Sequence, residues 1–134
     1  MVEDDPGDVL ITREALAEYK IRNRLVVLSD GLQAIAYLRR QPPFAGVALP
    51  DLILLDLNLP GVDGRAVLDT VRADPALAHI PVAVLTASRA EEDVLRSFGL
   101  NVELYATKPV DFTSLADIVR RVESLAIRVD KVRS

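Results

Sequence analysis

Acidic side chains gather at two separated places in this sequence, and a hydroxyl and an amine follow further along. Glu3 and Asp4 stand near the start, and Asp56, Thr86 and Lys108 each come directly after an apolar run. Two carboxylates about 4 Å apart repel by roughly 4 kcal/mol at an effective dielectric near 20, and a proton or a hard cation removes that cost. Such oxygen ligands suit Mg²⁺. A cation, an ammonium group and a hydroxyl around one carboxylate can bind a phosphoryl group, with Asp56 as its acceptor.

These residues meet only if the elements between them form one parallel sheet. Nearly continuous apolar runs predict strands buried on both faces, over residues 24–30, 51–60, 80–88 and 102–109. Amphipathic stretches predict helices over residues 6–20, 31–40, 64–73, 90–97 and from Asp111 onward. With a further strand just before Glu3, the alternation predicts an α/β fold, a doubly wound five-stranded parallel sheet with helices on both faces. Ligands bind beyond the carboxyl ends of such strands, where the candidate residues stand.

Each candidate has a plainer interpretation when it is taken alone. An aspartate after a strand is most often a turn or cap residue, and a lone lysine is usually solvated. Four strand ends that each deliver a polar group to the same edge are much harder to explain by chance. Asp5 is the exception, because its place before Pro6 predicts a cap for the helix over residues 6–20.

The composition of the chain excludes several classes of protein. The chain has 134 residues, 50% of them hydrophobic, a net charge of −4 and no cysteine. We expect a single domain over residues 1–134. No basic stripe is present to neutralise nucleic-acid phosphates, and no apolar run approaches the roughly 18–20 residues of a membrane span. The lack of cysteine excludes disulfides and thiolate catalysis, and it suits a cytoplasmic protein.

Four stretches resemble the signatures of the response-regulator receiver domain of two-component signalling. They are VEDDPGD, DLILLDLNLPGVDG, VLTAS and YATKP, and their order and spacing match across essentially the whole chain. The resemblance implies a flavodoxin-like sheet with strand order 2-1-3-4-5. It implies a Mg²⁺-dependent phosphoprotein switch rather than an enzyme, one that assists its own phosphorylation and dephosphorylation. Three longer stretches, EDDPGDVLITREAL, DLNLPGVDGR and DVLRSFGLNVELYATKPVDF, further resemble the small stand-alone regulators paired with phytochrome-type histidine kinases.

The resemblance also implies roles for single residues. Asp56 would be the phosphoacceptor. Asp4 would ligate Mg²⁺ directly, Glu3 would hold a metal-bound water, and Asp56 and the backbone carbonyl of Asn58 would complete the site. The residues that would contact the phosphoryl group, or move with it, are Thr86, Ala87, Lys108 and the aromatic Tyr105.

Asn58 and Ser88 follow Asp56 and Thr86 by two residues each. In receivers these positions flank the path of the hydrolytic water, so the resemblance implies that they tune the lifetime of the phosphoaspartate. That both are ordinary loop residues is an equally open interpretation.

The expected binding partners are inferred from the single histidine and from the apolar stripe of the last predicted helix. His79 is the single histidine and is expected to be a plain loop residue, so the phosphohistidine donor belongs to a partner kinase. We expect a homodimer through residues 86–129, where Ile118 and Leu125 widen an apolar stripe. With no DNA-binding domain after residue 134, output is expected by protein contact or by drawing phosphate from the kinase.

Two other functions stay open. A phosphohydrolase of the haloacid-dehalogenase kind also uses an aspartyl nucleophile and Mg²⁺, but it needs Asp-x-Asp-x-Thr after its first strand, and here Asn58 stands at the second aspartate position. The other is a receiver-like binding module that never accepts phosphate, although such modules usually lack part of the pocket. The first strand is expected to be truncated, because only Met1 and Val2 precede Glu3.

Overall fold

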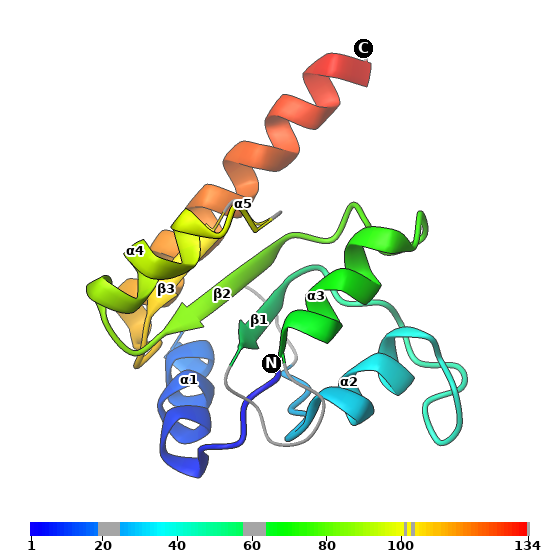
Figure 1. Cartoon of the computed structure of the whole chain (residues 1–134), viewed down its shortest axis with the longest axis horizontal. Helices are drawn as coiled ribbons and strands as arrows, with labels where there is room; N and C mark the ends of the chain where they lie inside the picture. Colours follow the sequence, from blue (N-terminus) through cyan, green and yellow to red (C-terminus); the bar gives the residue numbers. More distant parts are fainter. Residues whose placement is uncertain (19–24, 58–63, 101, 103, 134) are drawn as a thin grey trace.

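The computed structural model describes residues 1–18, 25–57, 64–100, 102 and 104–133, with side chains as far as Glu123. Its sheet has three regular strands, β1 (Ile53–Asp56), β2 (Val82–Thr86) and β3 (Leu104–Thr107). They are parallel and lie in the order β1-β2-β3 (Figure 1). Each strand lies inside one of the apolar runs that predicted it.

Two further segments extend the sheet through single bridges. Val2 pairs in parallel with Leu28 on one side and with Leu55 on the other. The Val2 N–H donates to the Leu54 carbonyl at 2.8 Å, and the Asp56 N–H donates to the Val2 carbonyl at 3.1 Å. The order across the sheet is therefore the Leu28 segment, the Val2 segment, β1, β2 and β3, which is the predicted order 2-1-3-4-5.

These two segments form bridges and no regular strand in the described part of the chain. Over residues 24–30, where a regular strand was expected, the pairing is a single bridge from Leu28 to Val2, and the segment before Glu3, which was expected to be truncated, pairs through Val2 alone. Met1 and Glu3 add backbone hydrogen bonds beside these bridges: the Met1 amino group donates to the Val26 carbonyl at 2.8 Å, the Leu28 N–H donates to the Met1 carbonyl at 3.0 Å, and the Glu3 N–H donates to the Leu28 carbonyl at 3.1 Å.

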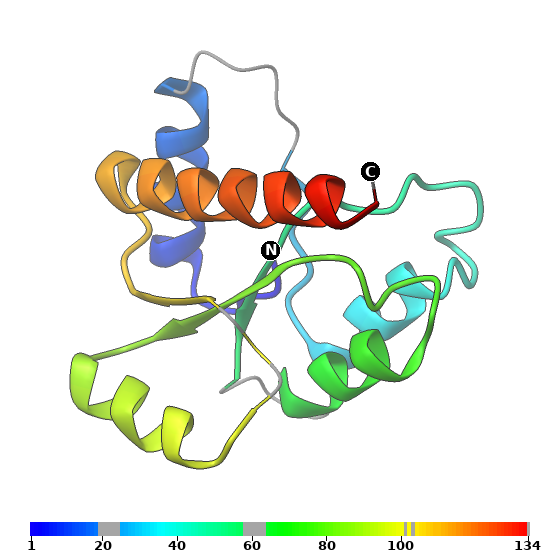
Figure 2. The same cartoon turned by 90° about the horizontal axis from the view of Figure 1, so that it is seen from above.

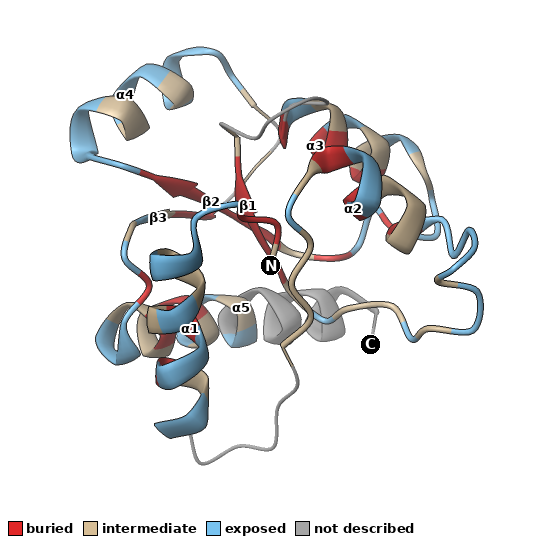
Figure 3. Cartoon of the chain, turned by 90° about the horizontal axis from the view of Figure 1, so that it is seen from below, coloured by how far each residue is buried: buried red, intermediate tan, exposed pale blue. Residues whose placement is uncertain are grey.

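Helices cover both faces of the sheet, as predicted. On one face lie α1 (Pro6–Glu18) and α5 (Phe112–Arg133), and on the other lie α2 (Gly31–Leu38), α3 (Gly64–Ala73) and α4 (Arg89–Ser97) (Figure 2). Every residue of β1 and β2 is buried (Figure 3). Successive strand residues point to opposite faces, so Leu55 and Val84 join the core beside α2 and α3, while Leu54 and Leu85 join the core beside α1 and α5.

The apolar stripe of α5 packs against the sheet more completely than the sequence predicted. Ile118 is 3% exposed and lies in the same core as Leu115 and Val110. The expectation that Ile118 contributes to a dimer contact is therefore wrong, because its side chain is already covered by this chain. Leu125 lies outside the described side chains.

Helix α4 contrasts with the others in how little it buries. It begins after Ser88, whose hydroxyl oxygen accepts from the Glu91 N–H at 3.2 Å. None of its residues is buried, and Val94 and the cap residue Phe98 are 54% and 60% exposed. No helix in the described ranges is long and apolar enough to cross a membrane.

Gly64 begins α3 directly against the end of β1. Its N–H donates to the Leu57 carbonyl at 3.3 Å. A Cβ at this position would lie 2.3 Å from the Asp56 carbonyl oxygen and 2.6 Å from the Leu57 Cα. Both atoms belong to the backbone, so no side-chain rotation can relieve the contact.

Gly64→Ala is therefore expected to lower the free energy of unfolding by about 3 kcal/mol, because overpacking would force the helix away from the strand end. Gly99→Ala is the matched control. Gly99 has a φ of +65° with open space around it, so only backbone strain of about 1 kcal/mol applies. Chemical denaturation measures both losses, and equal losses would contradict the steric argument.

Candidate functional site

Three carboxylates meet at the carboxyl edge of the sheet. Glu3 and Asp4 come directly after the Val2 bridge, and Asp56 is the last residue of β1. One carboxylate oxygen from each lies within 4.8 Å of the others. Glu3 and Asp56 are 1% and 3% exposed, whereas Asp4 is exposed. The structure thus brings together the three side chains that were predicted to hold a cation.

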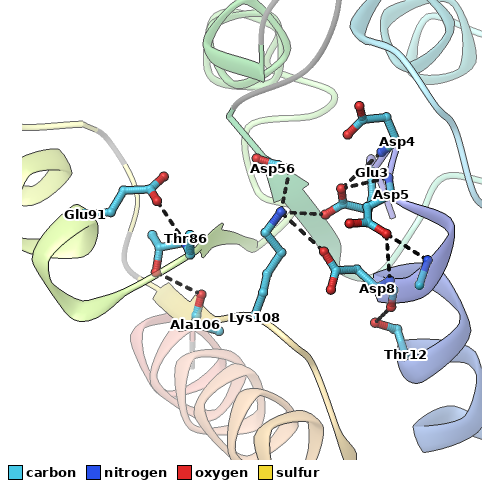
Figure 4. Close-up of polar contacts among 12 residues, drawn as sticks. Glu3, Asp4, Asp5, Asp8, Thr12, Asp56, Thr86, Glu91, Ala106 and Lys108 are labelled. Atoms are coloured by element: carbon cyan, nitrogen blue, oxygen red, sulfur yellow. Dashed lines mark hydrogen bonds and ion pairs between the residues drawn. The ribbon is translucent and has the colours of Figure 1, made fainter.

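Lys108 joins this cluster from the end of β3. Its backbone N–H donates to the Thr86 carbonyl at 2.7 Å, which fixes the start of its side chain. Its ammonium group donates to Asp56 Oδ2 at 2.8 Å and to Glu3 Oε2 at 3.2 Å (Figure 4). Asp8, in the first turn of α1, lies 3.6 Å from the same nitrogen. One ammonium group therefore faces three carboxylates from three different segments.

Glu3 is held on both of its oxygens. While Oε2 faces Lys108, Oε1 accepts from the backbone N–H groups of Asp4 and Asp5, each at 3.1 Å. Burial raises the pKa of Glu3 to about 7, and the nearby charge of Asp56 acts in the same direction. Its hydrogen bonds from the Asp5 backbone and from Lys108 lower the pKa but do not cancel the burial.

The charge on Lys108 is stabilised by its partners. Burial acts to lower the pKa of Lys108, but the hydrogen bond and charge of Asp56, followed by those of Glu3, outweigh it and raise the pKa above its ordinary value. The ammonium group therefore stays protonated at any physiological pH. The cluster as a whole still has more negative than positive groups, so it favours a further cation.

Asp5 has a different role from the carboxylates of this cluster, as predicted. Its Oδ1 accepts from the Gly7 N–H at 2.8 Å and from the Asp8 N–H at 3.3 Å. These bonds satisfy two free N–H groups in the first turn of α1, which confirms that Asp5 caps this helix.

Thr86 and Ala87 lie at the end of β2, where both have protein partners. The buried Thr86 hydroxyl donates to the Ala106 carbonyl at 3.4 Å, which turns it toward β3. The Ala87 N–H donates to Glu91 Oε2 at 3.0 Å. Ser88 Oγ accepts from the Glu91 N–H, so two side-chain bonds hold this start of α4, one from Ser88 and one from Glu91.

The sequence also singled out four further residues, which are Tyr105, Ser88, His79 and Asn58. Tyr105 is 6% exposed, and the Arg96 guanidinium carbon lies 4.4 Å from its ring centroid. Ser88 is exposed and caps α4. His79 is exposed in the turn before β2. Asn58 lies outside the described residues.

Sequence reasoning missed three contacts at this edge, those of Asp8, Glu91 and Arg96. Asp8 stands in the first turn of the helix that follows the acidic run, and Glu91 follows Ser88 at the capping-box spacing, so both positions carried a usable signal. Arg96 stacks on Tyr105 across two elements, and no local spacing indicates such a contact.

Comparison with known proteins adds independent support. The model of the response regulator receiver domain family matches residues 1–120. Response regulator Rcp1 from Synechocystis sp. is 43% identical over 124 residues, which cover 92% of this chain and 84% of Rcp1. Among solved structures, the bacteriophytochrome response regulator RtBRR superposes with a TM-score of 0.83 at 41% identity, covering 90% of this chain and 74% of RtBRR.

Two further solved structures resemble the chain at similar identity. The phosphorylated cyanobacterial phytochrome response regulator RcpA has a TM-score of 0.75 at 44% identity, covering 91% of this chain and 87% of RcpA. The Mn²⁺-bound form of Rcp1 has a TM-score of 0.74 at 43% identity, covering 92% of this chain and 88% of that one. The chain therefore belongs to the family of response regulator receiver domains.

Proposed function

We propose that this chain is a stand-alone response regulator that accepts a phosphoryl group on Asp56 from a partner histidine kinase and then changes its protein contacts. The observation that carries the proposal is the Asp56 carboxylate itself. It is buried at the end of β1, bonded to Lys108 at 2.8 Å and within 4.8 Å of the Glu3 and Asp4 carboxylates. A carboxylate fixed beside an ammonium group and further oxygen ligands is arranged to accept a phosphoryl group.

Glu3, Asp4 and Asp56 would hold the divalent cation, together with the backbone carbonyl of Asn58. The donors are oxygen atoms, which Mg²⁺ prefers, and Mg²⁺ needs only one or two carboxylates because it keeps several waters. Since both oxygens of Glu3 already accept hydrogen bonds, Glu3 is better placed to hold a metal-bound water than the metal. When bound, Mg²⁺ offsets negative charge on the transferring group.

The transfer itself uses residues that are already in place. An oxygen of Asp56 forms a bond to phosphorus while the bond from phosphorus to the kinase histidine nitrogen breaks. The new group carries about −1.5 to −2 charge, so the ammonium group of Lys108 turns toward its oxygens. The Thr86 hydroxyl exchanges the Ala106 carbonyl for a phosphoryl oxygen, and Ala87 leaves room because its side chain ends at Cβ.

The change then spreads to the surface around α4. Moving Thr86 alters the end of β2, to which the Ala87–Glu91 bond ties the start of α4. Tyr105 is buried beneath Arg96 of the same helix, so its ring senses any shift of α4. This is a shift in population between two arrangements, biased by a local charge.

Ser88 and Asn58 would tune how long the phosphoaspartate lasts. The Ser88 oxygen is engaged at the start of α4, so its influence on hydrolysis would depend on how that turn moves. We propose the same role for Asn58 solely because it follows Asp56 by two residues.

The partner kinase would be of the phytochrome type. The support is similarity, since three regulators named for phytochromes or bacteriophytochromes are 40–44% identical to this chain across most of its length. The phosphohydrolase alternative has less support, because Asp56 ends β1 and not the first strand segment of the chain, and the receiver family model matches residues 1–120. The alternative of a module that never accepts phosphate is decided by the labelling experiment below.

The homodimer remains a proposal, through α4, β3 and α5 within residues 86–129. Its support is the apolar surface that this chain leaves uncovered there. Val94, Phe98 and Phe112 are 54%, 60% and 43% exposed. With Ile118 buried, the contact would be centred on α4 rather than on the stripe of α5.

Asp56→Asn is expected to abolish phosphorylation, because the amide cannot act as the nucleophile. The measurement is the uptake of labelled phosphoryl group from acetyl phosphate with Mg²⁺ and from a phosphorylated phytochrome-type kinase. Asp51→Asn is the matched control, since this exposed residue just before β1 should leave labelling unchanged. Normal labelling of Asp56→Asn would refute the proposed function, and so would an unlabelled wild-type protein.

Mg²⁺ is expected to stabilise the fold by about 2.7 kcal/mol at a hundredfold excess over its dissociation constant. The gain should shrink with falling pH. The pKa of Glu3 is raised from 4.5 to about 7, so metal-free protein loses stability as the pH rises across that range, and below about pH 7 a proton neutralises Glu3 in the folded protein. Thermal unfolding at about pH 8 and about pH 5.5 tests both statements. An undiminished Mg²⁺ effect in Asp4→Asn would contradict the assignment.

Phe98→Glu is expected to weaken self-association by at least about tenfold, because a charge at the centre of an apolar contact cannot be desolvated cheaply. Sedimentation velocity over a range of concentrations measures this. Leu32→Glu is the control, since Leu32 is 65% exposed on α2, away from the proposed face. A wild-type protein that stays monomeric would end the dimer proposal.

A further inference from the structure

Asp8 is a fourth carboxylate at the site, and its geometry differs from that of the other three. It lies 3.6 Å from Lys108 Nζ, beyond hydrogen-bond distance, whereas Asp56 and Glu3 lie at 2.8 and 3.2 Å. Among the described residues, the group of carboxylates close enough to share a cation contains Glu3, Asp4 and Asp56 but not Asp8. Asp8 therefore influences the site through its negative charge beside the Lys108 ammonium group, and not as a ligand of the cation.

The position of Asp8 is fixed by its backbone. Its N–H donates to the capping Asp5 carboxylate at 3.3 Å, and its carbonyl accepts from the buried Thr12 hydroxyl at 3.1 Å. The side chains of Asp8 and Lys108 are only 22% and 18% exposed. Because the Asp8 carboxylate is partly shielded from water, its charge is screened less than an ordinary surface charge.

An incoming phosphodonor must come close to this charge. A phosphoryl group that touches both Asp56 and the Lys108 ammonium lies within roughly 7 Å of Asp8, as the sum of one ordinary polar contact and the Asp8–Lys108 separation. That is shorter than the Debye length of about 8 Å at physiological salt. The donor is thus attracted by Lys108 and repelled by Asp8 at the same time.

We propose that Asp8 sets the phosphodonor selectivity of this site: its fixed charge beside Lys108 disfavours doubly charged small-molecule donors. The inference rests on the proposed phosphorylation of Asp56. A kinase can overcome the repulsion with binding energy from its own contact surface, which a small donor lacks. Asp8 is a selectivity residue that keeps the site responsive to the kinase and poorly responsive to free acyl phosphates.

The test reaction is phosphoryl transfer to Asp56 from one of two small donors, acetyl phosphate or phosphoramidate. An Asp56 oxygen bonds to phosphorus as the bond from phosphorus to the acetate oxygen of acetyl phosphate breaks, and acetate leaves with the electron pair. With phosphoramidate, the bond from phosphorus to nitrogen breaks and ammonia leaves. At neutral pH acetyl phosphate is doubly charged and phosphoramidate is singly charged, so the two donors differ in the property that Asp8 would sense.

The experiment compares wild type and Asp8→Asn in the full chain with saturating Mg²⁺ and each donor in turn. Asp8→Asn is expected to raise the second-order rate constant for acetyl phosphate about threefold, a size typical of partly exposed charge pairs, and to change that for phosphoramidate much less. The gain should appear as a lower half-saturating concentration and should shrink with added salt. A purely structural role would move neither the donor ratio nor its salt dependence.

Two controls complete the design. Asp8→Glu restores the charge and should restore the wild-type donor ratio. Glu14→Gln removes an exposed charge from the same helix and should change neither rate constant. Equal gains with both donors, no gain, or a loss in Asp8→Asn overturns this inference while leaving phosphorylation of Asp56 intact. A wild-type protein that is labelled neither by these donors nor by a phosphorylated kinase overturns the proposed function, and this inference with it.

Discussion

The ammonium group of Lys108 is the contact on which the site depends. It neutralises part of a cluster in which Asp56 and Glu3 are almost completely buried, and buried carboxylates without a partner are costly. That contact is possible only because three segments end at the same edge of the sheet. The Val2 bridge, β1 and β3 must all run in the same direction and in the observed order. The parallel topology thus brings charges that are distant in the sequence to 2.8 and 3.2 Å from the Lys108 nitrogen.

A second set of contacts links this edge to α4. The Thr86 hydroxyl, the Ala87 N–H and the Tyr105 ring all have partners within the protein, namely the Ala106 carbonyl, Glu91 and Arg96. Each partner is polar or charged, and the hydrogen bonds of Thr86 and Ala87 can be exchanged for others without opening the apolar core, to which Tyr105 itself belongs. The proposed signal would therefore be carried by the exchange of polar partners, while the packing of the sheet is preserved.

Much of the fold could be predicted from the sequence, because the strands are buried on both faces and their runs are nearly continuously apolar. The helix predicted over 64–73 coincides with α3, and the run over 80–88 contains β2. The runs overestimate strand length because burial extends beyond the hydrogen-bonded ladder: Ile80 is buried but precedes β2.

The features that the sequence did not predict, such as the burial of Ile118 and the contact of Asp8 with Lys108, share a physical cause. Whether Ile118 faces a core or a partner depends on how closely α5 approaches the sheet, and the periodicity of a helix does not encode that distance. Asp8 reaches Lys108 only because the Asp5 cap sets the direction in which α1 leaves the site. The predicted gathering of Glu3, Asp4, Asp56 and Lys108 needed only the topology, whereas these finer contacts needed the angles between elements.

The missing side chain at Gly64 has a mechanical consequence. With backbone touching backbone, no layer of adjustable side chains separates α3 from the Asp56 end of β1. Displacement of that strand end must carry α3 with it, and α3 is anchored by the buried residues Val67, Leu68 and Val71. On the other side, α4 has no buried residue to resist movement. The molecule is therefore stiff on one flank of Asp56 and compliant on the other, so a disturbance at this carboxylate is directed toward α4.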